Sequence, residues 1–427
     1  MSRIKSLITL SLYHKPWPVS SAIAPRLDTT HLAEEEKIPD YHPDRFYPAR
    51  LGQILNQRYQ LATKLGYGAN STVWLARDLR RWRWSKEKYV AVKLNATATP
   101  SRQLPTDNEE RILRHISKLN PHHQGWHFIR KLSDSFQLEG VYGGKHSCLI
   151  LDALREPLWI YQQRYIDGFI PVGILKILLQ MTLQALDYLH SECHVIHADL
   201  KPDNIMIRIE DPSIFEEHAL DEFHHPLPQK HTGDRVIYLS RNNYGPLKRP
   251  TGIIQLMDFD LSVSTKPGRL HYGAIQAEIY RAPEVILEAG YTFSADIWSL
   301  GVLFWDLLEG KHLFNPHTPE KPDEYDEAPP RSLVSSGRRS SMFYDDNNPE
   351  TPRDPQPLAC NLSFEEGINQ IKGEEKRRFI SFVKRMIKWK PEERSTAKEL
   401  LGDPWLYEDF SQDQAKDKSP PRCLNES

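Results

Sequence analysis

Short apolar segments separated by turn residues run through the first third of the chain. Segments 58–65 and 73–76 lie on either side of the glycine-containing stretch 66–72, and segments 89–94 and 147–151 follow. Short runs of β-branched and other apolar residues, bounded by glycine or polar turns, are typical of strands. We therefore predict that this part of the chain is rich in β-structure.

Apolar positions recur at helical spacing in much of the remaining sequence. The predicted helices cover 107–116, 174–190, a segment that ends at Leu308, 376–387 and 394–401. Two short strands are expected as well, at 205–207 and 253–257. The chain thus changes from a strand-rich first part to a helix-rich second part.

Four stretches show neither the short apolar runs of strands nor the apolar spacing of helices. Residues 28–48 are first acidic and then contain proline and tyrosine, which predicts an extended arm. About forty mostly polar residues after Ile207 form an unusually long excursion and predict a surface insertion. Residues 315–358 are rich in proline, serine and acids, and the tail after Asp409 is polar, so both are expected to be largely unstructured.

Composition removes several classes of partner. The 427 residues carry a net charge of −2, so no overall basic field would attract nucleic acid or membranes. The four cysteines lie far apart and form no C-x-x-C pair, which favours a reducing compartment over a disulfide framework or a zinc site. No apolar run approaches the roughly 20 residues of a membrane span. The expected location is cytoplasmic and/or nuclear.

The first 27 residues leave a second location open. They contain Arg3, Lys5, Lys15 and Arg26, several serines and no acid. This composition is compatible with a mitochondrial transit peptide. A disordered basic tail is an equally good interpretation, because prolines interrupt any helix there.

The polar stretch 197–204 groups the residues that phosphoryl transfer needs. Asp199 can accept a hydroxyl proton, Lys201 can neutralise a phosphate, and Asn204 can help to hold a divalent cation. In phosphoryl transfer the protein mainly positions groups and stabilises charge. A polar loop after a helix is the alternative interpretation of this stretch alone.

Candidate nucleotide contacts precede this loop. Gly66 and Gly68, between two strands, would let backbone amides approach a phosphate chain, and Lys93 at the end of a strand could pair with phosphate oxygens. Glu109 shares the inward face of the next helix and could orient Lys93, with Glu110 as the alternative. A position between strands rather than before a helix argues against a Rossmann site.

Two strand ends complete the set of candidates. The apolar strand 147–151 stops at Asp152, where backbone groups up to Leu154 could bind an adenine edge. This polar connection also reads as a hinge between two lobes. Asp258, at the end of strand 253–257, is the second candidate metal ligand beside Asn204.

Taken in order, these segments resemble the eukaryotic protein kinases. The matching motifs are G-x-G-x-x-S-x-V at 66–73, V-A-V-K at 90–93, H-A-D-L-K-P-D-N at 197–204, D-F-D at 258–260, A-P-E at 282–284 and D-I-W-S-L-G at 296–301. The closer resemblance is to SR-protein kinases, in particular fungal-type members. It is carried by Y-P-A-R-L-G at 47–52, S-T-V-W-L-A-R-D at 71–78, E-I-Y-R at 278–281 and alanine in the middle of H-A-D.

The resemblance implies an α+β, two-lobed protein kinase fold, with a small β-rich N-lobe and a larger helical C-lobe. The expected bounds are an N-terminal extension at 1–58, the N-lobe at 59–151, the C-lobe at 152–410 with insertions near 208–250 and 315–360, and a disordered tail at 411–427. Glu284 and Arg394 are expected to form a structural ion pair in the C-lobe.

The resemblance also implies an activity, an ATP-dependent serine/threonine protein kinase with ATP and Mg²⁺ as cofactors. Asp199 and Lys201 would be catalytic, and Asn204 and Asp258 would hold the metal. The expected ATP-binding residues are Leu65, Gly66, Tyr67, Gly68, Ala69, Asn70, Ser71, Thr72, Val73, Lys93, Glu109, Asp152 and Leu154. The expected partner is a protein substrate, Arg/Ser-rich by resemblance, with no direct nucleic-acid or membrane partner, and the chain is expected to be monomeric.

Two positions depart from the family pattern. Ala198 replaces an arginine that would read a phosphorylated activation loop, so we expect activity that does not require phosphorylation of Ser262, Ser264 or Thr265. Asp260 stands where the family usually has glycine, whose backbone angles cost aspartate energy. This departure motivates the alternative function, a pseudokinase scaffold with weak or no phosphoryl transfer.

Overall fold

The structure is a computed structural model. It describes residues 12–39, 41–97, 107–141, 143–165, 168–233, 235–248, 252–314, 330–345, 353 and 364–408. The expected disordered tail, the first eleven residues and most of the 315–360 insertion lie outside these described residues.

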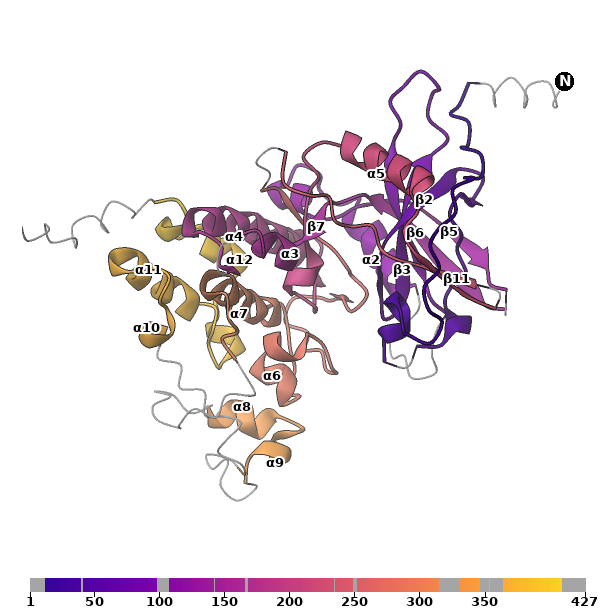
Figure 1. The fold of residues 1–427 in the computed structure, drawn as a ribbon. Coiled ribbons are helices and arrows are strands. Elements are labelled where there is room, and N and C mark those ends of the chain that lie inside the picture. The colour runs from indigo at the N-terminus through magenta and orange to yellow at the C-terminus, as the bar shows by residue number, and fades with distance from the viewer. Residues whose placement is uncertain are drawn as a thin grey trace, which may run out of the picture. The chain divides into compact units, whose positions relative to one another are not determined.

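The chain divides into two compact units. Described residues of Met1–Ser117, Arg130–Glu156 and Ile207–Thr251 form unit 1, and those of Lys118–Ile129, Pro157–Met206 and Gly252–Ser427 form unit 2. Unit 1 contains most of the strands and unit 2 most of the helices (Figure 1). This distribution agrees with the expected α+β class.

A six-stranded sheet forms the centre of unit 1. Its order is β1-β2-β3-β4-β6-β5 and its pairs are antiparallel. The strands are β1 (Ile54–Leu55), β2 (Tyr59–Gly68), β3 (Ser71–Asp78), β4 (Tyr89–Asn95), β5 (Leu132–Glu139) and β6 (Lys145–Asp152). Helix α2 (Asn108–Ile116) lies between β4 and β5 in the sequence.

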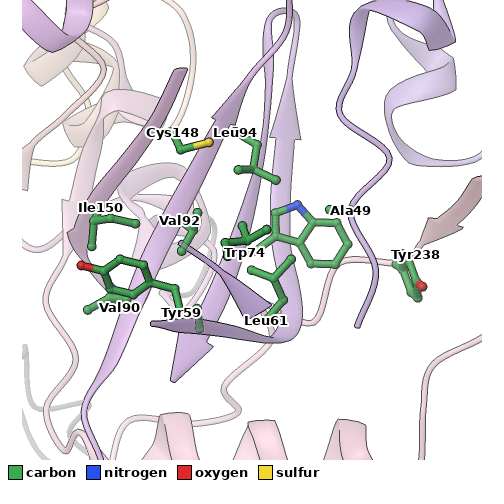
Figure 2. Packing of buried hydrophobic residues seen from close by; sticks show 12 residues of the cluster. Ala49, Tyr59, Leu61, Trp74, Val90, Val92, Leu94, Cys148, Ile150 and Tyr238 are labelled. Carbon is green, nitrogen blue, oxygen red and sulfur yellow. The ribbon is translucent and has the colours of Figure 1, made fainter. Parts of the chain in front are cut away.

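Alternating apolar residues bury one face of this sheet. Leu61, Trp74, Val92 and Ile150 come from four different strands and pack in one cluster (Figure 2). Burying a side chain of this size contributes roughly 1.5–3 kcal/mol. The cluster also includes Tyr238, which lies far along the chain, so the core of unit 1 is completed by a distant segment.

That distant segment is the insertion after Ile207. It contains α5 (Ser213–His224) and the hairpin of β10 (Gln229–Thr232) and β11 (Arg235–Tyr238). The insertion was expected within the C-lobe, whereas its described residues belong to unit 1 with the strands. The reason is apolar packing, because Ile214, Phe215 and Ala219 of α5 lie against Ala62 and Leu75 of the sheet.

The N-terminal arm belongs to unit 1 as well. It contains two short 3-10 helices, η1 (Glu34–Lys37) and η2 (Pro43–Arg45). Glu35 pairs with the buried Lys64 of β2, and Glu36 pairs with Lys230 of β10 at 2.7 Å. The arm, the insertion and the sheet therefore fold as one body.

Unit 2 begins where β7 (Glu156–Pro157) leaves unit 1. Its α-helices are α3 (Leu158–Gln162), α4 (Val172–Asp187), α6 (Pro283–Ile286), α7 (Ser294–Glu309), α8 (Arg331–Ser336), α9 (Ser340–Phe343), α10 (Phe364–Gly367), α11 (Gly373–Lys384) and α12 (Ala397–Leu401). Short strands β8 (Val195–Ile196), β9 (Ile205–Ile207), β12 (Ile254–Leu256) and β13 (Val263–Ser264) lie among them. Short one-turn helices complete it: η3 (Gln124–Phe128), η5 (Tyr188–Glu192), η6 (Pro202–Asn204), η7 (Glu278–Tyr280), η8 (Pro391–Glu393) and η9 (Pro404–Leu406).

Helix α4 and the π-turn η5 that follows it are longer and more apolar than the sequence analysis allowed. The segment Val172–Glu192 is long and apolar enough to cross a membrane by length and composition alone. Of its most apolar window, 61% is buried inside the protein, as in the core helix of a soluble protein, so this is weak evidence for a span.

The region expected to be unstructured around 315–358 contains two helices among its described residues, α8 and α9. Leu333 and Val334 of α8 and Tyr344 are buried in a small cluster with Leu287. The few aliphatic residues of this region are thus concentrated at one place, which composition alone does not reveal.

Candidate active site

The glycine-rich stretch is the turn between β2 and β3. Gly66 pairs with Val73 and Gly68 with Ser71, and the register shifts between Lys64 and Gly66. A Cβ atom added at Gly66 would meet no other atom within 4 Å, and neither Gly66 nor Gly68 has a positive φ. Neither packing nor backbone angle requires glycine here, which fits a backbone that a phosphate chain approaches closely.

Lys93 of β4 and Glu109 of α2 form a buried ion pair. The Lys93 Nζ atom lies 2.8 Å from Glu109 Oε1. Glu110, the alternative partner, instead accepts hydrogen bonds from Arg114, Ser135 and Ser147. Of the two glutamates that were candidate partners of Lys93, Glu109 is the one that pairs with it.

The hinge candidates follow β6. The carbonyl oxygen of Asp152 accepts hydrogen bonds from Arg130, at 3.2 Å from Nε and 2.8 Å from Nη2, and Leu154 is buried. Burial lowers the pKa of Lys131 to about 8, although the Asp152 carboxylate opposes this shift. The hinge is therefore a well-anchored segment with a partly buried lysine of lowered pKa nearby.

In unit 2, three of the predicted residues converge in the loop 197–204. Asp199 Oδ2 lies 2.6 Å from Lys201 Nζ and 2.9 Å from Asn204 Nδ2. The Asn204 amide also donates to the Asp199 backbone oxygen at 2.8 Å. Both side-chain contacts of Asp199 engage Oδ2, so Oδ1 is the oxygen that can meet a substrate hydroxyl.

One buried carboxylate that the sequence analysis did not assign holds this loop. Asp296 accepts hydrogen bonds from the backbone N–H groups of His197 (2.8 Å) and Ala198 (2.9 Å) and contacts His190 Nε2 at 2.9 Å. Burial raises the pKa of Asp296, but the hydrogen bonds and the neighbouring histidine charges outweigh it, and the pKa lies below its ordinary value. The only sequence signal was its place in the D-I-W-S-L-G motif.

The same contacts explain an unusual backbone angle. Ala198 has a φ of +67°, a left-handed conformation that is uncommon for residues other than glycine. Its side chain is fully buried, and its N–H points to Asp296. The carboxylate thus stabilises a conformation that the chain would otherwise avoid.

Asp258 follows β12 and is tied to the catalytic loop by its neighbours. The Met257 N–H donates to the Asn204 carbonyl at 2.9 Å, and the Met257 carbonyl lies 3.1 Å from His197 Nε2. Asp258 itself has a φ of +65°. The backbone strain in this motif is therefore at its first residue.

The backbone of Asp260 does not show the strain that was expected from the replacement of glycine. Asp260 is not among the residues with positive φ, so its backbone does not need the freedom of glycine. The physical argument for a disabled loop at Asp260 is therefore removed.

The donor set agrees with a magnesium site but not with a preformed metal cluster. Among the described residues, no three histidine, cysteine or acidic side chains gather to hold a metal ion. Mg²⁺ usually binds to one or two protein oxygens together with substrate phosphates and waters. The two bonds that the Asn204 amide donates both come from Nδ2, so its Oδ1 is the oxygen that would bind Mg²⁺, and Asp258 would add a carboxylate.

Comparison with known proteins places these features in a family. Residues 59–406 match the protein kinase domain. The serine/threonine protein kinase AFUB_078980 of Aspergillus fumigatus is 36% identical over 406 residues, which cover 91% of this chain and 94% of that protein. This chain belongs to the protein kinase family. Protein kinases in general use ATP and Mg²⁺.

Further similarities narrow the assignment of the kinase. The serine/threonine-protein kinase SRPK of Physarum polycephalum is 27% identical, with 88% of this chain and 92% of that protein covered. The kinase is thus a serine/threonine protein kinase of the SR-protein-kinase-like type, as its motifs indicated. No finding favours the pseudokinase alternative.

A solved structure shows the fold of the kinase. The PF14_0431 kinase domain covers 85% of this chain and 99% of its own, with a TM-score of 0.60 and 22% identity. The kinase therefore has the expected two-lobed α+β fold. The expected ion pair of unit 2 is also present: Arg394 donates to both Glu284 carboxylate oxygens at 2.6 and 2.7 Å, and both side chains are fully buried.

Proposed function

We propose that this kinase transfers the γ-phosphoryl group of ATP to serine hydroxyls of Arg/Ser-rich proteins. The observation that carries the proposal is the arrangement of Lys201 and Asn204 around a single oxygen of Asp199. That arrangement is the one phosphoryl transfer needs, and the likeness to the Physarum SRPK supports the substrate class.

On this proposal, Asp199 Oδ1 orients the attacking hydroxyl and accepts its proton. Lys201, held 2.6 Å from Oδ2, lies where it can neutralise charge on the transferred group. Asn204 and Asp258 would hold Mg²⁺, which supplies charge compensation for the phosphates. Asp199 keeps its orientation because two donors fix its other oxygen.

In unit 1, Lys93 would pair with nucleotide phosphates, and Glu109 would hold it in place. A buried lysine–carboxylate pair of this kind needs both members, because loss of one leaves an uncompensated charge. The backbone of the β2–β3 turn would approach the phosphates, and the Asp152–Leu154 backbone would meet the adenine edge.

The test is phosphate transfer from labelled ATP to an Arg/Ser peptide. Asp199→Asn should lower kcat by about 10²–10⁴, the usual contribution of a positioned base. Asp203→Asn, an exposed carboxylate of the same loop, is the matched control and should stay within about threefold of wild type. Equal rates for both variants would contradict the role of Asp199. Transfer to a Lys/Ser peptide at the same rate would contradict the substrate class.

We further propose that activity does not require activation-loop phosphorylation. Ser262 is buried and donates a hydrogen bond to the His197 carbonyl at 2.8 Å, and Thr265 is buried and contacts His271 Nε2 at 2.6 Å. Phosphatase-treated kinase should therefore keep its rate, with the phosphorylation state read by mass spectrometry. A large loss of activity on dephosphorylation of Ser262, Ser264 or Thr265 would contradict this.

For the compartment, we propose the cytoplasm and/or nucleus, supported by Cys148 and Cys193, which are buried thiols rather than disulfide partners among the described residues. A full-length fluorescent fusion tests it. A mitochondrial signal that depends on Arg3 and Lys5 would show that the first residues act as a targeting segment instead.

A further inference from the structure

Arg155 is the residue that directly follows the hinge segment Asp152–Leu154. Its side chain is fully buried, and its backbone N–H donates to the Ile207 carbonyl at 2.9 Å. Arginine is rarely buried unless it is paired and hydrogen-bonded. The side chain therefore needs partners inside unit 1.

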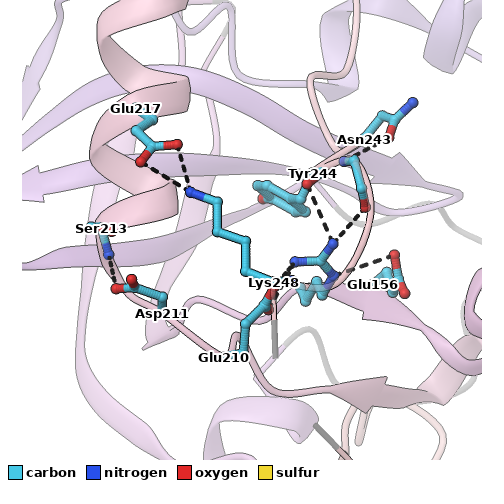
Figure 3. Close-up of polar contacts among 10 residues, drawn as sticks. Glu156, Glu210, Asp211, Ser213, Glu217, Asn243, Tyr244 and Lys248 are labelled. Carbon is cyan, nitrogen blue, oxygen red and sulfur yellow. Dashed lines mark hydrogen bonds and ion pairs between the residues drawn. The ribbon is translucent and has the colours of Figure 1, made fainter. Parts of the chain in front are cut away.

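Nearly all of these partners come from the insertion. Glu210, near its start, accepts from Arg155 Nη1 with both carboxylate oxygens, at 2.7 and 2.8 Å. Close to its end, the carbonyls of Tyr244 and Gly245 accept from Nη2 at 3.3 and 2.6 Å. Figure 3 shows Glu210 and Tyr244 on two sides of this group, with Glu156 on a third. One guanidinium thus joins both ends of the insertion to the hinge.

The insertion is in turn fixed to the strands that carry the other nucleotide contacts. Tyr244 lies in the same buried cluster as Phe215 of α5, Ala62 of β2 and Tyr89 of β4. The Tyr244 and Phe215 rings meet edge to face, with centroids 5.7 Å apart. Movement of Tyr244 is therefore restrained by the sheet.

Two of the proposed nucleotide contacts touch this cluster directly. Leu65, at the entrance to the glycine-rich turn, and Ala153, in the middle of the hinge, both pack against it. The cluster, which contains residues of both the insertion and the sheet, therefore contacts the hinge through Ala153 and the glycine-rich turn through Leu65. Arg155 joins the insertion itself to the residue after the hinge. Together these contacts relate the two backbone segments that a nucleotide would touch.

We propose that Arg155 is a positioning residue for ATP, which acts by fixing the hinge backbone to the insertion through Glu210 and Tyr244. This rests on the proposed role of Asp152–Leu154 as the adenine-binding segment. The insertion is then part of the nucleotide site's framework rather than a surface addition. Loss of the contact between the insertion and Arg155 should therefore weaken ATP binding more than it changes peptide binding or the chemical step.

The experiment compares Arg155→Met, Arg155→Lys and Glu210→Gln with wild type in the full chain. Arg155→Met should raise the KM for ATP about tenfold, which corresponds to ~1.4 kcal/mol of binding free energy. The KM for an Arg/Ser peptide and kcat should change by less than about twofold. Arg155→Lys keeps the charge but not the fork, so it should show an intermediate rise in the KM for ATP.

Lys248→Met is the matched control. Lys248 belongs to the same insertion, and its side chain pairs with Glu217 at 3.1 Å (Figure 3). Both side chains are at least half exposed. Only its backbone N–H contacts Glu210, and the substitution keeps that group. The KM for ATP of this variant should equal that of wild type.

Two outcomes would overturn the proposal. One is a KM for ATP within twofold of wild type in folded Arg155→Met. If Arg155→Met does not fold, the same result in folded Arg155→Lys and Glu210→Gln has the same meaning. The other is an equal effect on the KM for ATP, the KM for peptide and kcat. Hydrogen exchange of the wild-type hinge, measured with and without a non-hydrolysable ATP analogue, distinguishes failure of the proposed adenine site from failure of the proposed role of Arg155. If the amides of Ala153 and Leu154 are not protected, the proposed adenine site itself is wrong, whereas protection with an unchanged KM contradicts only the role of Arg155.

Discussion

The loop 197–204 of unit 2, which we propose is catalytic, and the strands of unit 1, which we propose contact the nucleotide, are stabilised in different ways. The catalytic loop depends on one buried carboxylate, Asp296, that binds two successive N–H groups of the loop. The strands of unit 1 depend on segments distant in the sequence. Lys64 of β2 pairs with Glu35 of the arm and donates to the Tyr238 carbonyl of the insertion at 3.0 Å.

The difference lies in where the stabilising groups come from in the sequence. In unit 2, the groups that stabilise the loop belong to the family motifs. In unit 1, the supporting groups come from an arm that precedes the matched residues 59–406 and from an insertion between motifs. Variants of each support should therefore weaken different regions of the kinase.

The largest effect is expected from Asp296→Asn. The two carboxylate oxygens of Asp296 make three contacts, whereas an amide has only one acceptor oxygen. The substitution therefore leaves a buried N–H group without an acceptor. The free energy of unfolding should fall by about 3–5 kcal/mol, the usual result of breaking a buried charged network. Urea denaturation measures it, with the exposed Glu392→Gln as the control. A loss below about 1 kcal/mol would mean that Asp296 does not hold the loop.

Lys64→Met should cause the next largest loss of stability, and a second substitution at Glu35 should reverse most of it. Lys64 is 1% exposed, and its removal leaves the Glu35 carboxylate buried without its main partner. We expect a loss of about 3 kcal/mol in the free energy of unfolding. The double variant Glu35→Leu/Lys64→Met removes both charges and should recover most of that loss. Equal losses for the single and double variants would show that packing, not charge, decides.

Lys131 provides a pH-dependent test near the hinge. Its pKa in the folded protein is about 8, below the ordinary 10.5, because burial disfavours the charged form. Below about pH 8 the folded state carries this cost in full. Between about pH 8 and pH 10.5 the folded state releases the proton before the unfolded state does, so wild-type stability should rise with pH in this window.

Lys131→Met should lack this rise and should be more stable than wild type at pH 7, by about 1 kcal/mol after allowance for partial exposure. Urea unfolding at pH 7, 8, 9 and 10 measures both. Parallel pH profiles for the two proteins would contradict the lowered pKa.

The smallest effect is expected from Asp260→Gly. Because Asp260 does not have a positive φ, glycine relieves no strain. Transfer to an Arg/Ser peptide should stay within about threefold of wild type, and stability should fall by about 0.5–1 kcal/mol through the entropy of glycine. A tenfold gain in kcat would restore the idea that aspartate restrains this loop.

The sequence was most informative where local pattern and chemistry coincide. The strands around Gly66, the position of Lys93 and the polar loop around Asp199 could all be predicted, because each depends on a short stretch. The bounds of α4 were close, although its apolar length was underestimated.

Long-range pairs could not be predicted in the same way. Nothing in the composition around Arg155 indicates Glu210 as its partner, since the two are separated by 55 residues of unrelated pattern. The insertion was expected at the surface of the C-lobe because it is polar on average. Its few apolar residues, such as Ile214 and Tyr238, are what attach it to unit 1.

The central claim, that the loop 197–204 of unit 2 and the strands β2 and β3 of unit 1 have separate supports, is tested most directly by hydrogen exchange in two variants. Lys64→Met should accelerate exchange in the β2–β3 hairpin and leave the loop 197–204 unchanged, relative to wild type under conditions of local opening. Asp296→Asn should give the reverse pattern. If both variants accelerate exchange equally in both regions, the supports are not separate and the account is wrong.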